Sequence, residues 1–95
     1  MRTKSPEEIV LRPVITEKTL RIAERENAYT FQVHVTANKV QVRDAIERLF
    51  NVAVVDVRTQ NIQGKRRRMG RYVGTTGNWK KAVVKVREGD TIDFH

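Results

Sequence analysis

Residues 28–50 read AYTFQVHVTANKVQVRDAIERLF, and two hydrophobic periods follow one another within them. The apolar side chains of the first part are Tyr29, Phe31, Val33 and Val35. Because they alternate with polar ones, the pattern predicts a strand at 28–35 with one buried face. From Asn38 onward, apolar residues recur at the three- and four-residue spacing of an amphipathic helix, and Asn38 is a suitable N-cap. We therefore predict a helix at 39–50 directly after the strand.

The remaining elements are predicted outward from this pair. A short helical turn is expected at 5–8, and Thr16 is a suitable N-cap for a helix at about 16–25. Stretches rich in β-branched residues or with alternating side chains predict strands at 52–63 and 81–87. The order of elements indicates an α+β fold in which an antiparallel sheet of three or four strands packs with two main helices.

Length and composition limit the function classes. The 95 residues suffice for a single domain, 1–95, and no apolar run has the roughly 20 residues that a membrane span needs, so no membrane insertion is expected. With no cysteine and two histidines, no metal site or cofactor is expected. We find no phosphate-loop or dinucleotide pattern and predict no catalytic residue, so an enzyme is disfavoured. A small phosphate-ester hydrolase that uses Arg and Asn remains a weak alternative.

The net charge of +8 is unevenly distributed along the chain. Residues 57–87 hold ten Lys or Arg and no acid, whereas the other 64 residues hold nine bases and eleven acids, a net charge of −2. The chain therefore combines a nearly neutral body with one strongly cationic segment. Such a segment indicates an anionic partner.

Residues 64–80 form the centre of the cationic segment. They read GKRRRMGRYVGTTGNWK, contain four of the five glycines, and form a connection much longer than an ordinary hairpin loop. We predict an extended basic hairpin loop at 64–80 that an anionic partner orders, most plausibly RNA, because arginines neutralise phosphates and aromatic rings stack on bases. The residues predicted to bind RNA are Lys65, Arg66, Arg67, Arg68, Arg71, Tyr72, Trp79, Lys80, Lys81 and Lys85.

Other interpretations of these residues stay open at this level. The basic run is also compatible with a solvated surface, and Lys81 and Lys85 with ordinary outward-facing charges on a strand. Trp79 is equally compatible with packing at the base of the hairpin. For the whole chain, a free RNA- or DNA-binding regulatory protein and a protein-interaction adaptor are the alternatives.

Several short motifs occur in an order that resembles a known family. They are Arg12-Pro13-Val14-Ile15-Thr16-Glu17-Lys18, the Asn38-Lys39 helix ending in Leu49-Phe50, Gly64-Lys65-Arg66 through Gly70-Arg71, and Trp79-Lys80-Lys81-Ala82. Together they resemble the bacterial large-subunit ribosomal proteins of the universal L-twenty-three family, over about residues 8–94. The resemblance departs at 75–78, where many relatives carry arginines and this chain has Thr-Thr-Gly-Asn.

The resemblance implies a structural, non-enzymatic role in the large ribosomal subunit, in the cytoplasm. It implies early binding to the third domain of large-subunit rRNA and a loop, 64–80 here, directed towards the polypeptide exit tunnel and the nascent chain. It also implies a body at the tunnel rim beside a small helical ribosomal protein, without homo-oligomerisation. Glu17 is, by the same resemblance, the docking residue for trigger factor, in the area that also meets signal recognition particle.

Overall fold

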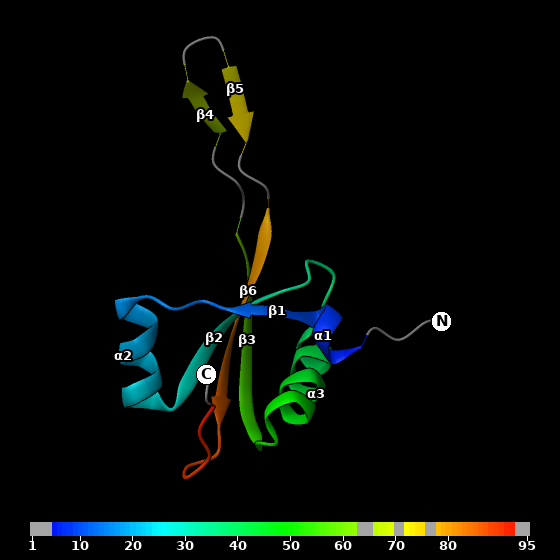
Figure 1. Cartoon of the computed structure of the whole chain (residues 1–95), viewed down its shortest axis with the longest axis vertical. Helices are drawn as coiled ribbons and strands as arrows, with labels where there is room; N and C mark the ends of the chain where they lie inside the picture. The colour runs from blue at the N-terminus through cyan, green and yellow to red at the C-terminus, as the bar shows by residue number, and fades with distance from the viewer. Residues whose placement is uncertain (1–4, 63–65, 70–71, 76–77, 93–95) are drawn as a thin grey trace.

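The computed structural model describes residues 5–62, 66–69, 72–75 and 78–92, the two short middle ranges through their backbone alone. Figure 1 shows a sheet flanked by helices, with a small separate hairpin beyond one end of the sheet. The elements in chain order are α1 (Pro6–Ile9), β1 (Val10–Pro13), α2 (Glu17–Glu26), β2 (Ala28–Val33), α3 (Lys39–Phe50), β3 (Val54–Ile62), β4 (Arg66–Met69), β5 (Tyr72–Thr75) and β6 (Trp79–Val86).

The main sheet has four antiparallel strands in the order β1-β2-β6-β3. This confirms the predicted α+β fold with an antiparallel sheet and two main helices. The fourth strand is β1, a segment that the sequence pattern did not identify as a strand. It is only four residues long and ends in Pro13, which has no N–H to donate and therefore suits the edge of a sheet.

Both main helices begin within one residue of their predicted starts, and a side-chain cap fixes each start. At the start of α3, the Asn38 side chain accepts a hydrogen bond from the Gln41 N–H at 2.8 Å, and the Asn38 N–H donates to Gln41 Oε1 at 3.0 Å. The start of α2 has the same reciprocal arrangement between Thr16 and Thr19. Local sequence therefore determines where these helices begin.

The core lies between α3 and one face of the sheet. Val42, Ala45 and Ile46 of α3 are fully buried, as the helical spacing predicts, and Phe31 of β2 is 0% exposed. The rings of Phe31 and Phe50 lie 5.7 Å apart between their centroids. The prediction for Val35 was wrong: β2 ends at Val33, and Val35 lies outside the strand with 52% of its surface exposed.

The second helix covers the other face of β2. Figure 1 shows α2 and α3 on opposite sides of the sheet. Ala28 and Thr30, which alternate with the core residues, are buried as well, and the Thr30 hydroxyl has no hydrogen-bond partner within the described part of the chain. The predicted single buried face of this strand is therefore wrong, because α2 adds a third layer that periodicity along β2 does not reveal.

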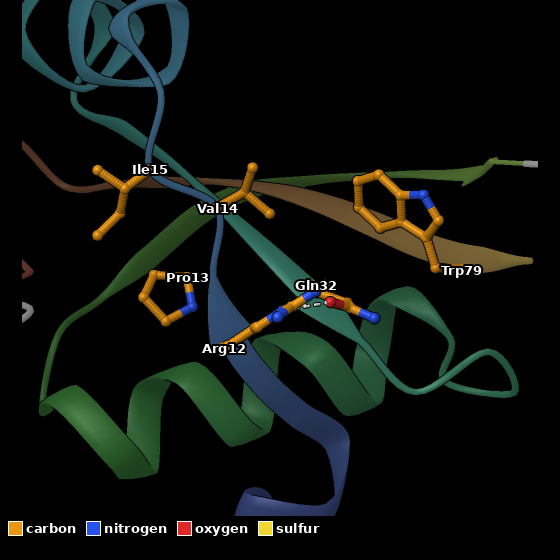
Figure 2. Close-up of a pocket in the computed structure, with 6 residues that line it drawn as sticks. All are labelled: Arg12, Pro13, Val14, Ile15, Gln32 and Trp79. Carbon is orange, nitrogen blue, oxygen red and sulfur yellow. Dashed lines mark hydrogen bonds between the residues drawn. The ribbon is translucent and has the colours of Figure 1, made fainter. Parts of the chain in front are cut away.

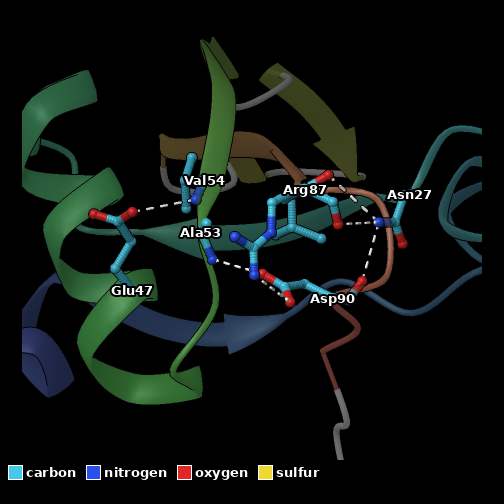
Figure 3. A network of polar contacts seen from close by, with 7 residues as sticks. Asn27, Glu47, Ala53, Val54, Arg87 and Asp90 are labelled. Atoms are coloured by element: carbon cyan, nitrogen blue, oxygen red, sulfur yellow. Dashed lines mark hydrogen bonds and ion pairs between the residues drawn. The ribbon is translucent and has the colours of Figure 1, made fainter.

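A polar network ties the end of β6 to the rest of the body (Figure 3). Asn27, in the left-handed conformation at φ 55°, donates from its side-chain amide to the carbonyls of Arg87 and Asp90, each at 3.0 Å. Asp90 Oδ2 accepts the Ala53 N–H at 2.9 Å, and this hydrogen bond, with a smaller contribution from Arg87, lowers the pKa of Asp90. The network places the residues after β6 against the body, where Ile92 is buried.

Candidate nucleic-acid interface

Strand β6 divides its side chains between two faces of the sheet. Ala82, Val84 and Val86 are almost fully buried in the core on the α3 side. Because successive side chains of a strand point to opposite faces, Lys81 and Lys85 lie on the other side, the first half-buried and the second exposed. Two of the predicted RNA-binding residues therefore share the face that α3 does not cover.

Neighbouring strands extend this face on both sides of β6. The register sets Gln32 of β2 and Gln60 of β3 opposite Lys81, and Arg12 of β1 opposite Gln32. A row across the sheet thus contains two cations and two amides.

The charge of the face changes along β6. Near Lys85 lies the acid Asp56, whose carboxylate is 3.6 Å from the guanidinium of Arg58 in an exposed ion pair. Glu26 lines the same shallow groove as Lys85. The end of the face nearest Trp79 is therefore the more cationic end.

Lys80 is on the opposite face from Lys81. Its Nζ donates a hydrogen bond to the Ala37 carbonyl at 2.5 Å and so joins the start of β6 to the connection between β2 and α3. The structure therefore does not bring Lys80 together with Lys81, although the two are adjacent in sequence.

The cationic segment contains a second, separate sheet. Strands β4 and β5 pair antiparallel, with Arg66 opposite Thr75, Arg68 opposite Val73, and Met69 opposite Tyr72. Figure 1 shows this pair standing apart from the helices, beyond the ends of β3 and β6. Residues 66–69 and 72–75 of the predicted hairpin loop thus pair as two short strands. Of the predicted RNA-binding residues, Lys65 and Arg71 lie outside the described residues.

Trp79 lines a groove beside the free edge of the sheet (Figure 2). The groove encloses about 340 Å³ and is lined by Arg12, Pro13, Val14, Ile15, Gln32 and Trp79. Arg12 Nε donates to Gln32 Oε1 at 2.6 Å across the pair of strands β1 and β2. Sequence analysis missed Arg12 and Gln32, because they are 20 residues apart and only the register of β1 on β2 brings them to Trp79.

Glu17 lies on the body, at the first position of α2, and is exposed. On either side of it in sequence, Ile15 and Leu20 are 55% and 51% exposed, so both aliphatic side chains are largely open to solvent. Glu17 is therefore an exposed acid with exposed aliphatic residues on both sides of it in sequence.

The described residues show no other chemical centre. No group of three or more His, Cys, Asp or Glu within them is arranged to hold a metal ion. Nor is any helix in the described ranges both long enough and apolar enough to cross a membrane.

Comparisons with known proteins match nearly the whole chain. The family model described as ribosomal protein L23 matches residues 8–94. The large ribosomal subunit protein uL23 of Heliobacterium modesticaldum is 49% identical over 91 residues, which cover 96% of this chain and 95% of that protein. The protein of the same name from Anaeromyxobacter sp. strain K is 54% identical over 86 residues, 90% of this chain and 89% of that protein.

Proposed function

This chain belongs to the ribosomal protein L23 family, and from that premise we propose that it attaches to large-subunit rRNA through its cationic segment and presents its body to other proteins. It is a structural constituent of the large ribosomal subunit, located with that subunit in the cytoplasm, and it is not an enzyme. The proposal concerns which surfaces of the chain carry out this role.

The observation that carries the RNA part is the separation of charge. Ten bases and no acid occupy residues 57–87, and the structure divides this segment between a hairpin apart from the body and strands β3 and β6 of the main sheet. Affinity for a phosphate backbone comes from the release of counterions as phosphates are neutralised, so cations concentrated on one segment favour contact along a continuous RNA surface. Arginine guanidinium groups also form paired hydrogen bonds with phosphate.

The hairpin is the part of the chain that we propose to extend towards the exit tunnel and the nascent chain. Figure 1 supports this assignment, because β4 and β5 lie far from α2 and α3. The hairpin can therefore contact a part of the large subunit that the body does not contact. The third domain of the rRNA is the proposed partner, bound early in assembly. We further propose that the body lies at the tunnel rim as a single copy, beside a small helical ribosomal protein.

Sedimentation of a cell lysate in a high-salt gradient tests the ribosomal assignment directly. The protein is expected to co-sediment with large subunits, because many phosphate contacts formed during assembly are buried from exchange with salt. A free RNA- or DNA-binding regulator, the alternative function, would instead remain in the light fractions at this salt concentration. Recovery of the protein only in those fractions would contradict the proposed function.

The docking part of the proposal assigns trigger factor and signal recognition particle to the surface around Glu17. The residue is exposed, lies outside the cationic segment, and is accompanied by the exposed aliphatic side chains Ile15 and Leu20. A partner that carries a cation beside an apolar patch fits this surface by charge and by composition.

Replacing Glu17 by alanine is expected to weaken recruitment of trigger factor to large subunits by on the order of tenfold, because one interfacial charge typically contributes this much. Assembly of the variant into subunits should be unchanged, since Glu17 lies outside the cationic segment. Glu24→Ala is the matched control, because Glu24 is an exposed acid on the same helix. Binding of trigger factor to purified subunits is the measurement, and equal affinities for the two variants would contradict the assignment of Glu17.

A further inference from the structure

We propose that the groove beside Trp79 is a binding site for a single unstacked RNA nucleotide, whose base lies against the indole ring while its phosphate meets the cations at the groove edge. This inference rests on the proposed RNA-binding function and adds a defined subsite to it. It assigns roles to Arg12 and Gln32, which lie outside the cationic segment 57–87.

The first support is the position of the indole ring. Trp79 is the first residue of β6 and pairs with Ile62 of β3, so its backbone is fixed by the main sheet. Its side chain is not in the core cluster but lines the groove, whose lining also includes the apolar residues Pro13 and Val14 from the edge strand and the segment after it. Figure 2 shows Val14 on the side of this chain segment that faces Trp79. A half-buried aromatic ring on a fixed strand beside apolar residues is a stacking platform for a base, and every nucleobase has a face that stacks.

The second support is the polar group in the groove. Gln32 Oε1 is occupied by the Arg12 Nε–H at 2.6 Å, and this bond orients the carboxamide. Figure 2 shows the amide nitrogen of Gln32 on the side nearer Trp79. Two N–H donors at this position suit the ring nitrogens and carbonyl oxygens on the edge of a base that stacks on Trp79.

The third support is the charge around the groove. Its lining contains the cation Arg12 and no acid among the described residues. The Arg12 guanidinium uses Nε for Gln32, so its terminal N–H groups remain to bind a phosphate, and Lys81 is opposite Gln32 in the register. An apolar peptide would satisfy the apolar residues but not these cations, whereas a nucleotide satisfies both. The groove also lies at the start of β6, where the chain returns from the basic hairpin, so RNA that follows the hairpin reaches it.

The chain offers a direct optical test, because Trp79 is its only tryptophan. Titration of the full chain with an oligoadenylate is expected to quench Trp79 fluorescence, since stacking brings the base onto the indole. Linear polyphosphate of the same charge should compete for binding without quenching, because it has phosphates and no bases. Equal quenching by both polyanions would overturn the nucleotide site, and so would quenching by an apolar peptide with none by oligoadenylate, which would assign the groove to a protein partner.

Variants separate the subsite from general RNA binding. For Trp79→Leu, we expect affinity for a transcript of the third rRNA domain to fall by about 5- to 100-fold with the same salt dependence, because a stacking contact is lost and no phosphate contact is. Trp79→Phe should recover part of the affinity, and Ile62→Val, at the cross-strand partner outside the groove, should have little effect.

The two levels of the proposal fail in different ways. Wild-type affinity of a folded Trp79→Leu chain would overturn the nucleotide site and leave RNA binding by the cationic segment intact. Absence of binding between the wild-type chain and the transcript would overturn the proposed function itself.

Discussion

Raising the salt concentration from about 50 mM to about 200 mM is expected to weaken binding of this protein to a third-domain rRNA transcript by roughly three decades. This value corresponds to about six neutralised phosphates, because each neutralised phosphate releases condensed counterions and adds nearly one unit to the slope of log affinity against log salt. Residues 57–87 contain ten bases, so six contacts need only part of the segment. The measurement is a set of filter-binding or fluorescence titrations at several salt concentrations.

A triple substitution locates these contacts within the chain. Replacing Arg66, Arg67 and Arg68 by glutamine is expected to lower the magnitude of the salt slope by about 2 to 3 units and the low-salt affinity by on the order of 100-fold or more. The matched control replaces Lys18, Arg21 and Arg25 of α2, which removes the same number of charges from exposed positions of the body. If contact with RNA is made by the hairpin, the control keeps the wild-type slope.

Two outcomes would contradict the electrostatic account. An affinity that scarcely changes with salt would mean that phosphate neutralisation does not drive binding. Equal losses for the hairpin variant and the α2 control would mean that the overall charge of +8, rather than the position of the cations, determines affinity.

Replacing Phe31 by alanine is expected to reduce the free energy of unfolding by about 3–5 kcal/mol, because truncating a fully buried aromatic side chain removes its apolar burial and leaves a cavity. Phe31 also faces the ring of Phe50 across the interface between the sheet and α3, and this contact is lost with it. Domains of this size are stable by only about 5–15 kcal/mol, so the variant loses a large fraction of its stability. Urea denaturation followed by far-UV circular dichroism measures the change.

The control for Phe31 is an apolar residue that the body leaves open to water. Val40, on α3, is 70% exposed, and Val40→Ala should change the free energy of unfolding by less than about 0.5 kcal/mol. A loss of similar size for the two substitutions would show that the interface between α3 and the sheet is not the main source of stability.

Features that depend on near neighbours in sequence were predicted well. The capped starts of α2 and α3, the buried stripe of α3 and the positions of the three longer strands of the main sheet follow from hydrogen bonds and periodicities within a few residues. Membership of the family was indicated by ordered motifs, and the matches to the family model and to curated relatives confirm it.

The errors occurred where distant segments meet. Strand β1 was missed because four residues ending in proline have no periodicity of their own, and pairing with β2 makes them a strand. Thr30 was assigned to a solvent-facing side because the alternation of β2 gives no information about α2 on its far side. The extended hairpin itself was predicted, but the strands β4 and β5 within it were not, since glycine- and arginine-rich stretches have little strand character.

The sequence by itself determined that this protein separates a cationic segment from a nearly neutral body, because charge is a property of each residue and its order along the chain is directly visible. The tertiary structure alone decided which of the described cations share a face of the sheet. It placed Lys81 beside Gln32 and Arg12, and it turned the adjacent Lys80 to the other face, where it bonds the Ala37 carbonyl. The physical reason is that adjacent residues of a strand point to opposite faces, whereas strand register joins residues that are far apart in sequence.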